Sequence, residues 1–330
     1  MAAYFDLRLI DGDLLTTAAD LVCLKHAQSL YGVDQAAVAA LVARGAAVEH
    51  ELAAAPGAVV VVDTRGALTA PRAAFLGTVR LGELRYHELR ILAGRMLALG
   101  QREGAARLAT TVHGVRAGLD EDEAILALVG GFVDTFQGGG GGRVAEVLIV
   151  ESNVARARRM RAALARGLAS TAGVSALPDG GFRVERQVGF QQAPPLASAG
   201  QVAIKAHAFV AMPFAAELDD VFHYGIAGPV KAAGLLCERV DQAQFDGLII
   251  ERIRASIDGA RVVIADLSMA NPNVYLEVGY AWGRGRPTIL LVRDVKELRF
   301  DVAAHRVLPY ASIRQLETLL TTELARVLGS

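Results

Sequence analysis

The stretch between Val262 and Ala281 constrains most strongly what this chain can fold into. It opens with Val262–Ala265, a short and uninterrupted apolar run that is typical of a central strand buried on both faces. Asp266 ends the run, a turn rich in Ser, Asn and Pro follows, and a helix is predicted to begin near Asn273. Such a strand–loop–helix unit places polar side chains at the carboxyl end of a sheet, where open α/β folds bind ligands.

Three polar side chains in this stretch are candidates for a functional site. Glu277 lies about one turn into the predicted helix, on a largely apolar stretch. A carboxylate there is solvated, paired with an arginine, or reactive, and spacing alone leaves these three alternatives open. Asp266 and Asn273 also have an ordinary alternative, because Asp and Asn form turns and cap helices in any protein.

The segment Asn271–Ala281 resembles the signature of the nucleoside 2-deoxyribosyltransferase-like and TIR-like nucleotide-binding domains of bacteria. The likeness continues in the family's order over Ala208–Phe214, Cys237–Asp241, Ile264–Leu267 and Phe300–Arg306. The resemblance implies a doubly wound, mostly parallel sheet. In this half of the chain, the residues themselves predict a helix from Glu217 to Ala233. For Glu277 the resemblance implies a catalytic role, in which the carboxylate attacks or stabilises the anomeric carbon of an N-glycoside. Cleavage of that bond passes through an oxocarbenium-like state, which a nearby carboxylate stabilises or traps.

The same resemblance implies substrate-binding roles for Phe214, Asp241, Asp266 and Asn273. Phe214 is expected to stack on a base or pyridine ring. Asp266 and Asn273 are expected to hold the ribose or base by hydrogen bonds. Asp241 is expected to line the same crevice, although a structural ion pair with Arg239 is an equal alternative.

The first half of the chain alternates apolar strands with helices, which predicts a mostly parallel sheet covered by helices on both faces. Strands are predicted at residues 5–10, 19–24, 58–63, 72–79, 108–112 and 144–150, and a long helix at residues 35–54. The fold class predicted for the whole chain is therefore α/β, with two doubly wound, mostly parallel sheets.

The order of these elements, and three local motifs, resemble a macro domain. Ile10–Leu14 is similar to the segment whose aspartate, here Asp13, holds an adenine. Thr110–Glu123 is similar to the glycine-rich phosphate loop and the helix after it, with Gly114 and Gly118 in the loop. The third motif is the closing strand and helix. The resemblance implies a sensor that binds a nucleotide or ADP-ribose-type ligand.

One position departs from the macro-domain pattern. Macro domains that hydrolyse ADP-ribose linkages carry an asparagine pair after the second strand, where this chain has Lys25–Ala27. We therefore expect ligand binding without catalysis in this half. His113, in the predicted phosphate loop, is either a ligand contact or a structural histidine.

A change in composition separates the two halves. Residues 170–203 lose periodicity and gather Gly, Pro, Ser and Ala, which predicts a linker. Residues 1–169 are then the macro-like domain and residues 204–330 the TIR-like domain. Within the linker, Phe182–Val188 alternates polar and apolar residues and is predicted as an edge strand or hairpin arm.

Composition excludes several classes of function. The net charge of −1, with acids and bases interspersed, argues against a nucleic-acid or anionic-membrane surface. No apolar run approaches the ~18 residues of a membrane span, and no signal-peptide pattern opens the chain. Cys23 and Cys237 lie far apart, make no metal-ligand spacing and fit a reducing, cytoplasmic location. We expect no metal and no cofactor, with NAD as a substrate.

Together the two resemblances favour a nucleotide-sensing effector of bacterial anti-phage or stress signalling, whose second half hydrolyses the nicotinamide–ribose bond of NAD. A deoxyribosyltransferase or N-glycosidase of nucleoside salvage is the second hypothesis, and a non-catalytic nucleotide-binding protein is the third. We also expect self-association, because the small net charge opposes it little and neighbouring subunits complete the site in related proteins.

Overall fold

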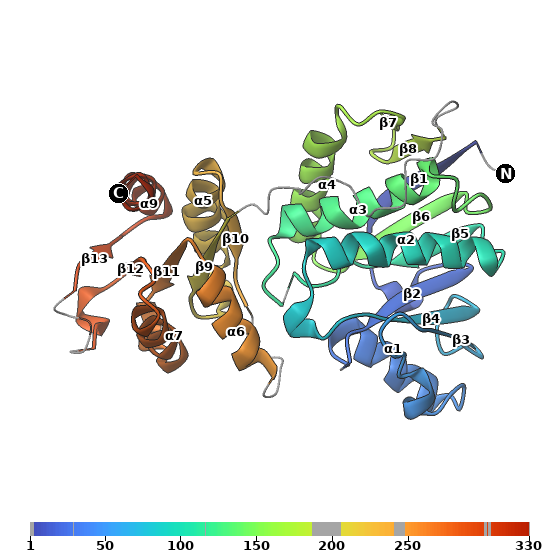
Figure 1. Ribbon diagram of the computed structural model, residues 1–330, viewed down its shortest axis with the longest axis horizontal. Helices are drawn as coiled ribbons and strands as arrows, with labels where there is room; N and C mark the ends of the chain where they lie inside the picture. Colours follow the sequence, from blue (N-terminus) through green and yellow to red (C-terminus); the bar gives the residue numbers. More distant parts are fainter. Residues whose placement is uncertain are drawn as a thin grey trace. The chain divides into compact units, whose positions relative to one another are not determined.

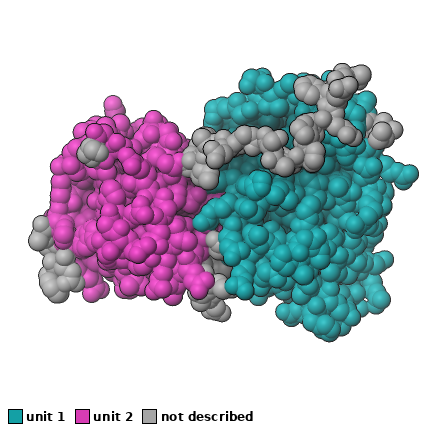
Figure 2. Space-filling model, viewed as in Figure 1, with its two compact units in different colours: residues 1–115, 121–199 teal, residues 116–120, 200–330 magenta. Residues whose placement is uncertain are grey.

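The computed structural model describes residues 3–28, 30–115, 117–186, 206–240, 248–299, 302 and 305–329. The chain divides into two compact units, called unit 1 and unit 2 (Figures 1 and 2). Unit 1 comprises residues 1–115 and 121–199, and unit 2 comprises residues 116–120 and 200–330. Each contains a largely or wholly parallel sheet between helices, which confirms the predicted α/β fold class. No helix among the described residues is long and apolar enough to cross a membrane.

Unit 1 is built on an eight-stranded sheet in the order β3-β4-β2-β5-β6-β1-β8-β7. The five strands from β4 to β1 run parallel, whereas β3, β8 and β7 pair antiparallel with their neighbours. The strands are β1 (Tyr4–Asp11), β2 (Leu21–His26), β3 (Val59–Asp63), β4 (Arg72–Gly77), β5 (Arg107–Thr110), β6 (Glu146–Glu151), β7 (Val174–Ala176) and β8 (Phe182–Glu185).

The strand predicted near Phe182 is confirmed as β8, which pairs with both β1 and β7. Residues 174–185, which the sequence placed in the linker, therefore extend the first sheet. Residues 187–203 of the predicted linker lie outside the described residues.

Helices cover both faces of this sheet. The helices are α1 (Gly32–Ala43), α2 (Tyr86–Arg102), α3 (Glu121–Gln137) and α4 (Val154–Leu168). Met96 of α2, Phe132 of α3 and Met160 of α4 share one core, and α1 packs into the core on the other face (Figure 1). The helix predicted at residues 35–54 is too long. It ends because Gly45 adopts a left-handed φ of 69°, and Glu49–Leu52 forms a separate 3₁₀ turn, η2.

Helices α2 and α3 pack closely through a glycine. A Cβ added to Gly131 in α3 would lie 2.1 Å from the backbone oxygen of Arg90 in α2. The adjacent Gly130 differs, because its added Cβ would meet only the guanidinium of Arg90, at 2.7 Å. A backbone oxygen cannot move without shifting the helix, whereas the end of an arginine side chain can.

We therefore expect Gly131→Ala to destabilise the protein by about 1–3 kcal/mol through overpacking. Gly130→Ala is the matched control, because it gains the ~0.5–1 kcal/mol by which Ala exceeds Gly in a helix and needs only a side chain to move. Denaturant unfolding of both variants measures the difference. Equal midpoints would show that the close approach at Gly131 does not limit stability.

The described residues of unit 2 form a sheet of five strands, all parallel, in the order β10-β9-β11-β12-β13. They are β9 (His207–Ala211), β10 (Leu236–Glu238), β11 (Val262–Asp266), β12 (Thr288–Val292) and β13 (Val307–Pro309). Helices α6 (Leu248–Gly259) and α7 (Pro272–Gly283) cover one face, and α5 (Gly228–Ala232) and α9 (Ile313–Leu328) the other (Figure 1). In chain order the strands read 2-1-3-4-5, the flavodoxin-like arrangement of doubly wound folds.

The segment predicted as one helix from Glu217 to Ala233 is broken into three pieces. A short 3₁₀ turn (Ala216–Leu218) precedes a π-helical turn, η5 (Val221–Ala227), and then α5. Gly225 of η5 lies close to α9, since an added Cβ would come within 2.7 Å of Leu316. Single π-helical turns are rare and often lie at functional sites.

Candidate functional site

The carboxyl ends of β9 and β11 form the candidate site in unit 2. These strands are neighbours, but the chain leaves them toward opposite faces, through η5 and α5 after β9 and through α7 after β11. Open α/β sheets bind ligands at such a switch point, because the loops diverge there. Of the predicted residues, Asp266 ends β11, and Phe214 and Glu277 come from the segments that follow β9 and β11.

Glu277 lies on the buried stripe of α7. Its side chain is 6% exposed, and Val274, Val278 and Ala281 on the same stripe belong to the core beneath the helix. The solvated alternative for Glu277 is therefore wrong, and the paired and reactive alternatives stay open. A carboxylate removed from water in this way interacts strongly with any positive charge that approaches it.

Asp266 is fully buried, and both of its carboxylate oxygens accept hydrogen bonds from the protein. Oδ1 accepts from the backbone N–H of Ser268 at 3.0 Å, and Oδ2 accepts from the hydroxyl of Tyr310 at 2.6 Å. Burial and the Asp266 carboxylate raise the pKa of Tyr310, so its phenol stays protonated and donates. A direct contact between Asp266 and substrate would require the Tyr310 hydrogen bond to open.

Two residues that the sequence did not single out complete this arrangement. Tyr310 follows β13, and the hydroxyl of Ser268 accepts from the backbone N–H of Arg293 just after β12, at 2.9 Å. Asp266 and Ser268 thus join the ends of β11, β12 and β13. No local sequence signal indicates these links between strand ends, because Tyr310 and Arg293 lie far from Asp266 and Ser268 along the chain.

Phe214 is 41% exposed, and a guanidinium covers one face of its ring. The Arg239 Cζ lies 3.8 Å from the centroid of the Phe214 ring and 4.4 Å from that of Phe222. A substrate ring could therefore stack only on the opposite face of Phe214. Arg239 forms an ion pair with Asp219, at 3.6 Å, and Asp241 lies outside the described residues, so the alternative of an Arg239–Asp241 ion pair stays open.

Asn273 is exposed in the first turn of α7, but it does not cap the helix. The cap is Asn271, whose side-chain oxygen accepts from the backbone N–H of Asn273 at 2.9 Å. The residues just before it, Met269 and Ala270, have left-handed φ angles of 64° and 46°. Such backbone strain in residues other than glycine clusters at ligand-binding loops, and the sequence did not predict it here.

The predicted sensor residues fall in different units. Asp13 is exposed after β1, where its Oδ1 accepts from the backbone N–H of Leu15 at 2.9 Å and so caps a 3₁₀ turn. Gly114 is buried in unit 1 with a φ of +87°. Gly118 belongs to unit 2, where it has a φ of +97° and an added Cβ would lie 2.6 Å from Val240. Asp13 and Gly114 therefore belong to unit 1, whereas Gly118 belongs to unit 2.

A buried charged cluster in unit 1 occupies the position where the sequence departs from catalytic macro domains. Lys25, at the end of β2, forms an ion pair with Asp34, and its Nζ lies 3.8 Å from the Tyr31 ring centroid. Burial acts to lower the pKa of Lys25, but the interactions with Asp34 and Tyr31 together outweigh it and the pKa is raised. Burial and the Lys25 charge hold the pKa of His113 well below its usual value.

Two atoms of this cluster are buried without a hydrogen-bond partner among the described residues. They are Oδ1 of Asp34 and Nε2 of His113. Buried polar atoms are nearly always satisfied, by protein, water or a ligand. The cluster is therefore a second candidate site, at the carboxyl end of β2 and in the loop after β5.

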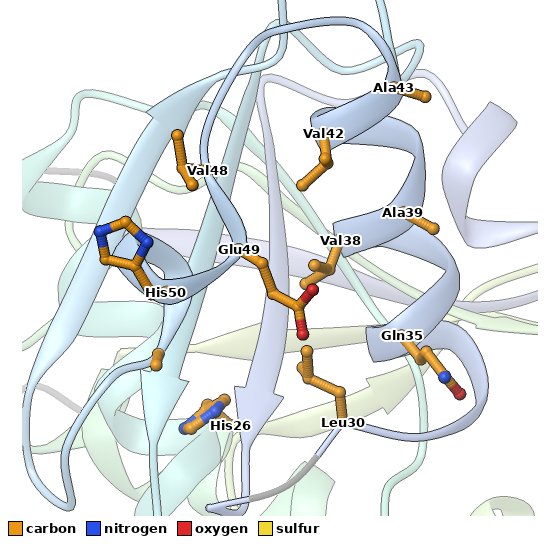
Figure 3. Close-up of a pocket in the computed structure, with 11 residues that line it drawn as sticks. His26, Leu30, Gln35, Val38, Ala39, Val42, Ala43, Val48, Glu49 and His50 are labelled. Atoms are coloured by element: carbon orange, nitrogen blue, oxygen red, sulfur yellow. The ribbon is translucent and has the colours of Figure 1, made fainter.

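A cavity of about 930 Å³ lies beside this cluster, between α1 and η2 (Figure 3). Its walls are mainly apolar, and Figure 3 shows the Glu49 carboxylate projecting between Val38 and Leu30. His26 also lines it, and the Nδ1 of His26 lies 2.9 Å from the carbonyl oxygen of Ala54, so this nitrogen carries the proton. Among the described residues, no group of His, Cys, Asp and Glu could hold a metal ion.

No known protein family and no curated protein matches this sequence. Solved structures do match. The Oceanobacillus iheyensis macrodomain with MES bound is 14% identical, with a TM-score of 0.40, over 50% of this chain and 96% of its own. A mutant of that macrodomain with ADPR is 14% identical, with a TM-score of 0.41, over 51% and 100%. The Trypanosoma brucei macrodomain in complex with ADP is 16% identical, with a TM-score of 0.39, over 48% and 68%.

Over about half its length, this chain is similar to macrodomains. The likeness concerns the fold. The resemblance of the second half to TIR-like domains stays a prediction.

The contribution of the hydrogen bond between Tyr310 and Asp266 to stability can be tested by mutation. Tyr310→Phe leaves Asp266 Oδ2 buried without a partner, which should cost about 1–3 kcal/mol of unfolding free energy. Tyr280→Phe is the control, because its hydroxyl bonds Asp258 at 3.1 Å in a partly exposed place where water can substitute. Denaturant unfolding compares the two variants. Equal losses of unfolding free energy would contradict a stabilising role for the buried Tyr310–Asp266 hydrogen bond.

The pKa of Tyr310 adds a dependence on pH. Because this pKa is raised in the folded protein, the unfolded chain loses the proton first, above pH of about 10. The stability that the phenol contributes is therefore complete below that pH and declines above it. The part of the decline in unfolding free energy that is due to Tyr310 should be missing in Tyr310→Phe, and denaturant unfolding on both sides of a pH of about 10 measures it.

Proposed function

We propose that this protein binds nucleotides and that unit 2 hydrolyses the nicotinamide–ribose bond of NAD. One observation carries the proposal. Glu277 is a buried carboxylate on the helix that directly follows the central strand β11, at the switch point of a doubly wound parallel sheet. Such a position suits stabilisation of a positive charge on a sugar that is bound at the strand ends.

The chemistry of NAD needs little beyond such a carboxylate. The bond between C1′ and the pyridinium nitrogen breaks, and its electron pair stays on the nitrogen. Nicotinamide therefore leaves as a neutral molecule and requires no proton donor. The ribosyl cation that remains is stabilised by Glu277 until water adds to C1′, which yields ADP-ribose and a proton.

The product links this reaction to unit 1. ADP-ribose belongs to the ligand class that the macro-domain resemblance implies for the first half of the chain. A protein that pairs NAD hydrolysis with binding of such ligands fits bacterial anti-phage or stress signalling. Its activity would then respond to a nucleotide, in an assembled state if neighbouring subunits complete the site.

Glu277→Gln should fold normally but lower glycosidic turnover by a factor of about 10² or more, because the charge is removed while the shape is kept. Glu317→Gln, on the exposed face of α9, is the matched control and should retain turnover. Chromatography of products identifies the reaction after incubation with NAD and, separately, with deoxynucleosides.

Each product pattern decides between the hypotheses. Release of nicotinamide supports NAD hydrolysis, whereas exchange of bases between deoxyribosides supports a transferase. No product in either reaction would leave a binding protein as the answer. Near-native turnover in a folded Glu277→Gln variant would remove Glu277 from the mechanism.

For unit 1 we propose binding of an ADP-ribose-type ligand without hydrolysis. The partnerless atoms of Asp34 and His113 support a ligand at the carboxyl end of the sheet, near the left-handed Gly114. The ion pair with Lys25 supports the absence of catalysis, because it neutralises the Asp34 carboxylate within the protein. Asp13 is proposed to hold the adenine.

Asp13→Ala should weaken the affinity for ADP-ribose about tenfold or more, which corresponds to loss of one charge-assisted hydrogen bond. Asp63→Ala is a close control. Its Oδ1 accepts from the N–H of Arg65, two residues on, as the Oδ1 of Asp13 does from Leu15. Calorimetry on the full chain should show the loss for Asp13→Ala alone. Equal affinities of the two variants would contradict an adenine contact.

A further inference from the structure

One edge of the unit 1 sheet is formed by β3, which pairs with β4 alone (Figure 1). Its residues, Val59–Asp63, are four valines and one acid. Natural proteins protect a free strand edge with lysine, proline, a bulge or a covering segment. β3 contains neither lysine nor proline, and its register with β4 is continuous, without a bulge. The other edge of the sheet, β7, is shorter and more exposed. The apolar edge of unit 1 is therefore β3.

Hydrogen bonds at the two ends of β3 show which of its residues face β4. Just before the strand, the carbonyl of Ala58 accepts from the N–H of Gly77 at 3.0 Å. Just after it, the N–H of Thr64 donates to the carbonyl of Pro71 at 2.8 Å. In an antiparallel pair, every second residue bonds its neighbour in this way. The even-numbered residues of β3 therefore bond β4.

The odd-numbered residues turn their backbone groups away from β4. They are Val59, Val61 and Asp63, and each presents an N–H and a C=O to the open side of the strand. Among the residues that the structure describes, these groups have no hydrogen-bond partner. Backbone groups of a strand require partners, from water or from another strand. β3 is thus prepared to accept one more strand.

The side chains of β3 are half-buried on both faces of the sheet. Val59 and Val61 pack against the core that α2, α3 and α4 share, and Val60 and Val62 pack against the core that includes α1. Each valine keeps part of its apolar surface exposed. A further strand would cover that surface, with a gain of about 25 cal/mol per Å².

The sequence of β3 is self-complementary in an antiparallel pair centred on Val61. A twofold axis at that residue places it opposite the same residue of a second copy, and places Val59 opposite Asp63. These are the residues whose backbone groups face outward, so each pair can exchange both hydrogen bonds. On the other face of the sheet, Val60 lies opposite Val62. No pair places like charges opposite each other, which would oppose the pairing.

The charges near β3 fit the same register. Arg95 of α2 donates to the carbonyl oxygens of Gly77 at 2.6 Å and Ala58 at 2.8 Å, and it forms no ion pair among the described residues. Burial lowers the pKa of this guanidinium, because its charge is partly removed from water. Asp63 shares the α2 face of the sheet with Val59. The Asp63 of a second copy, opposite Val59, would therefore approach Arg95 and attract it.

We propose that β3 is the interface between two copies of this chain, whose β3 strands pair antiparallel about Val61. The two unit 1 sheets then form one continuous sheet. The contact closes on itself, because both copies use the same strand, and it yields a dimer without further growth. The self-complementary register and the attraction between Asp63 and Arg95 favour a second copy over a strand of another protein. The interface does not depend on the reaction proposed for unit 2.

Val61→Pro tests the backbone contact in the full chain. Proline removes an N–H that faces outward and leaves the bonds to β4 in place, so unit 1 should fold. Val61→Thr is the matched control, because it keeps the N–H and the branched shape. Sedimentation velocity over a dilution series should show a dimer for the native chain and for Val61→Thr. The dissociation constant of Val61→Pro should be about tenfold higher or more.

Cross-linking tests the register. Val61→Cys should form a disulfide between two copies when an oxidant is added, because the Cα atoms of directly opposite residues lie about 5.5 Å apart. Asp63→Cys is the control. Its two thiols would lie roughly 14 Å apart in the same dimer, because residue 63 faces residue 59 and not itself. The native Cys23 and Cys237 are buried and should not react.

Each outcome supports or overturns the interface. A native chain that stays monomeric throughout the dilution series would overturn it, and so would equal dissociation constants for Val61→Pro and the native chain. If Val61→Pro does not fold, the cysteine variants decide. A disulfide in Val61→Cys alone supports pairing about Val61. Equal yields in the two cysteine variants, or no cross-link in either, would refute that pairing.

Discussion

The carboxylate of Asp266 imposes the main constraint on unit 2. It stands at the end of a strand that is buried on both faces, where an unpaired charge would be very costly. The structure meets this requirement by bringing the Tyr310 hydroxyl and the Ser268 N–H to its two oxygens. The ends of three parallel strands are thereby held together, and the loop that leads into α7 is held with them.

Both candidate sites use charges that the protein itself restrains. In unit 1 the Lys25–Asp34 ion pair removes a free carboxylate from the site, while burial and the charge of Lys25 lower the pKa of His113. In unit 2 the rings of Phe214 and Phe222 pack against the guanidinium of Arg239. The first arrangement favours binding without reaction. The second places a restrained positive charge at the edge of the unit 2 site.

Some local predictions failed for identifiable reasons. The helix expected at residues 35–54 stops early because Gly45 takes a left-handed conformation, although the apolar spacing continues beyond it. The helix expected from Glu217 to Ala233 is broken into 3₁₀, π and α turns, which periodicity does not distinguish. In contrast, the apolar run of β11 and the step into α7 were predicted correctly. Their signals are local, since a fully buried strand and a helix start are both written in consecutive residues.

The residue pattern alone predicted the α/β class and the buried strand at Val262–Ala265, but it left open whether Glu277 is solvated or buried. The contacts around these residues depend on the folded chain. Tyr310 reaches Asp266 from 44 residues away, and the rings against Arg239 come from separate turns of the chain. Hydrogen bonds and ring contacts act over a few ångströms in space, whatever the separation along the chain. Residue spacing therefore predicts the elements, but it cannot predict which side chains from distant elements will meet.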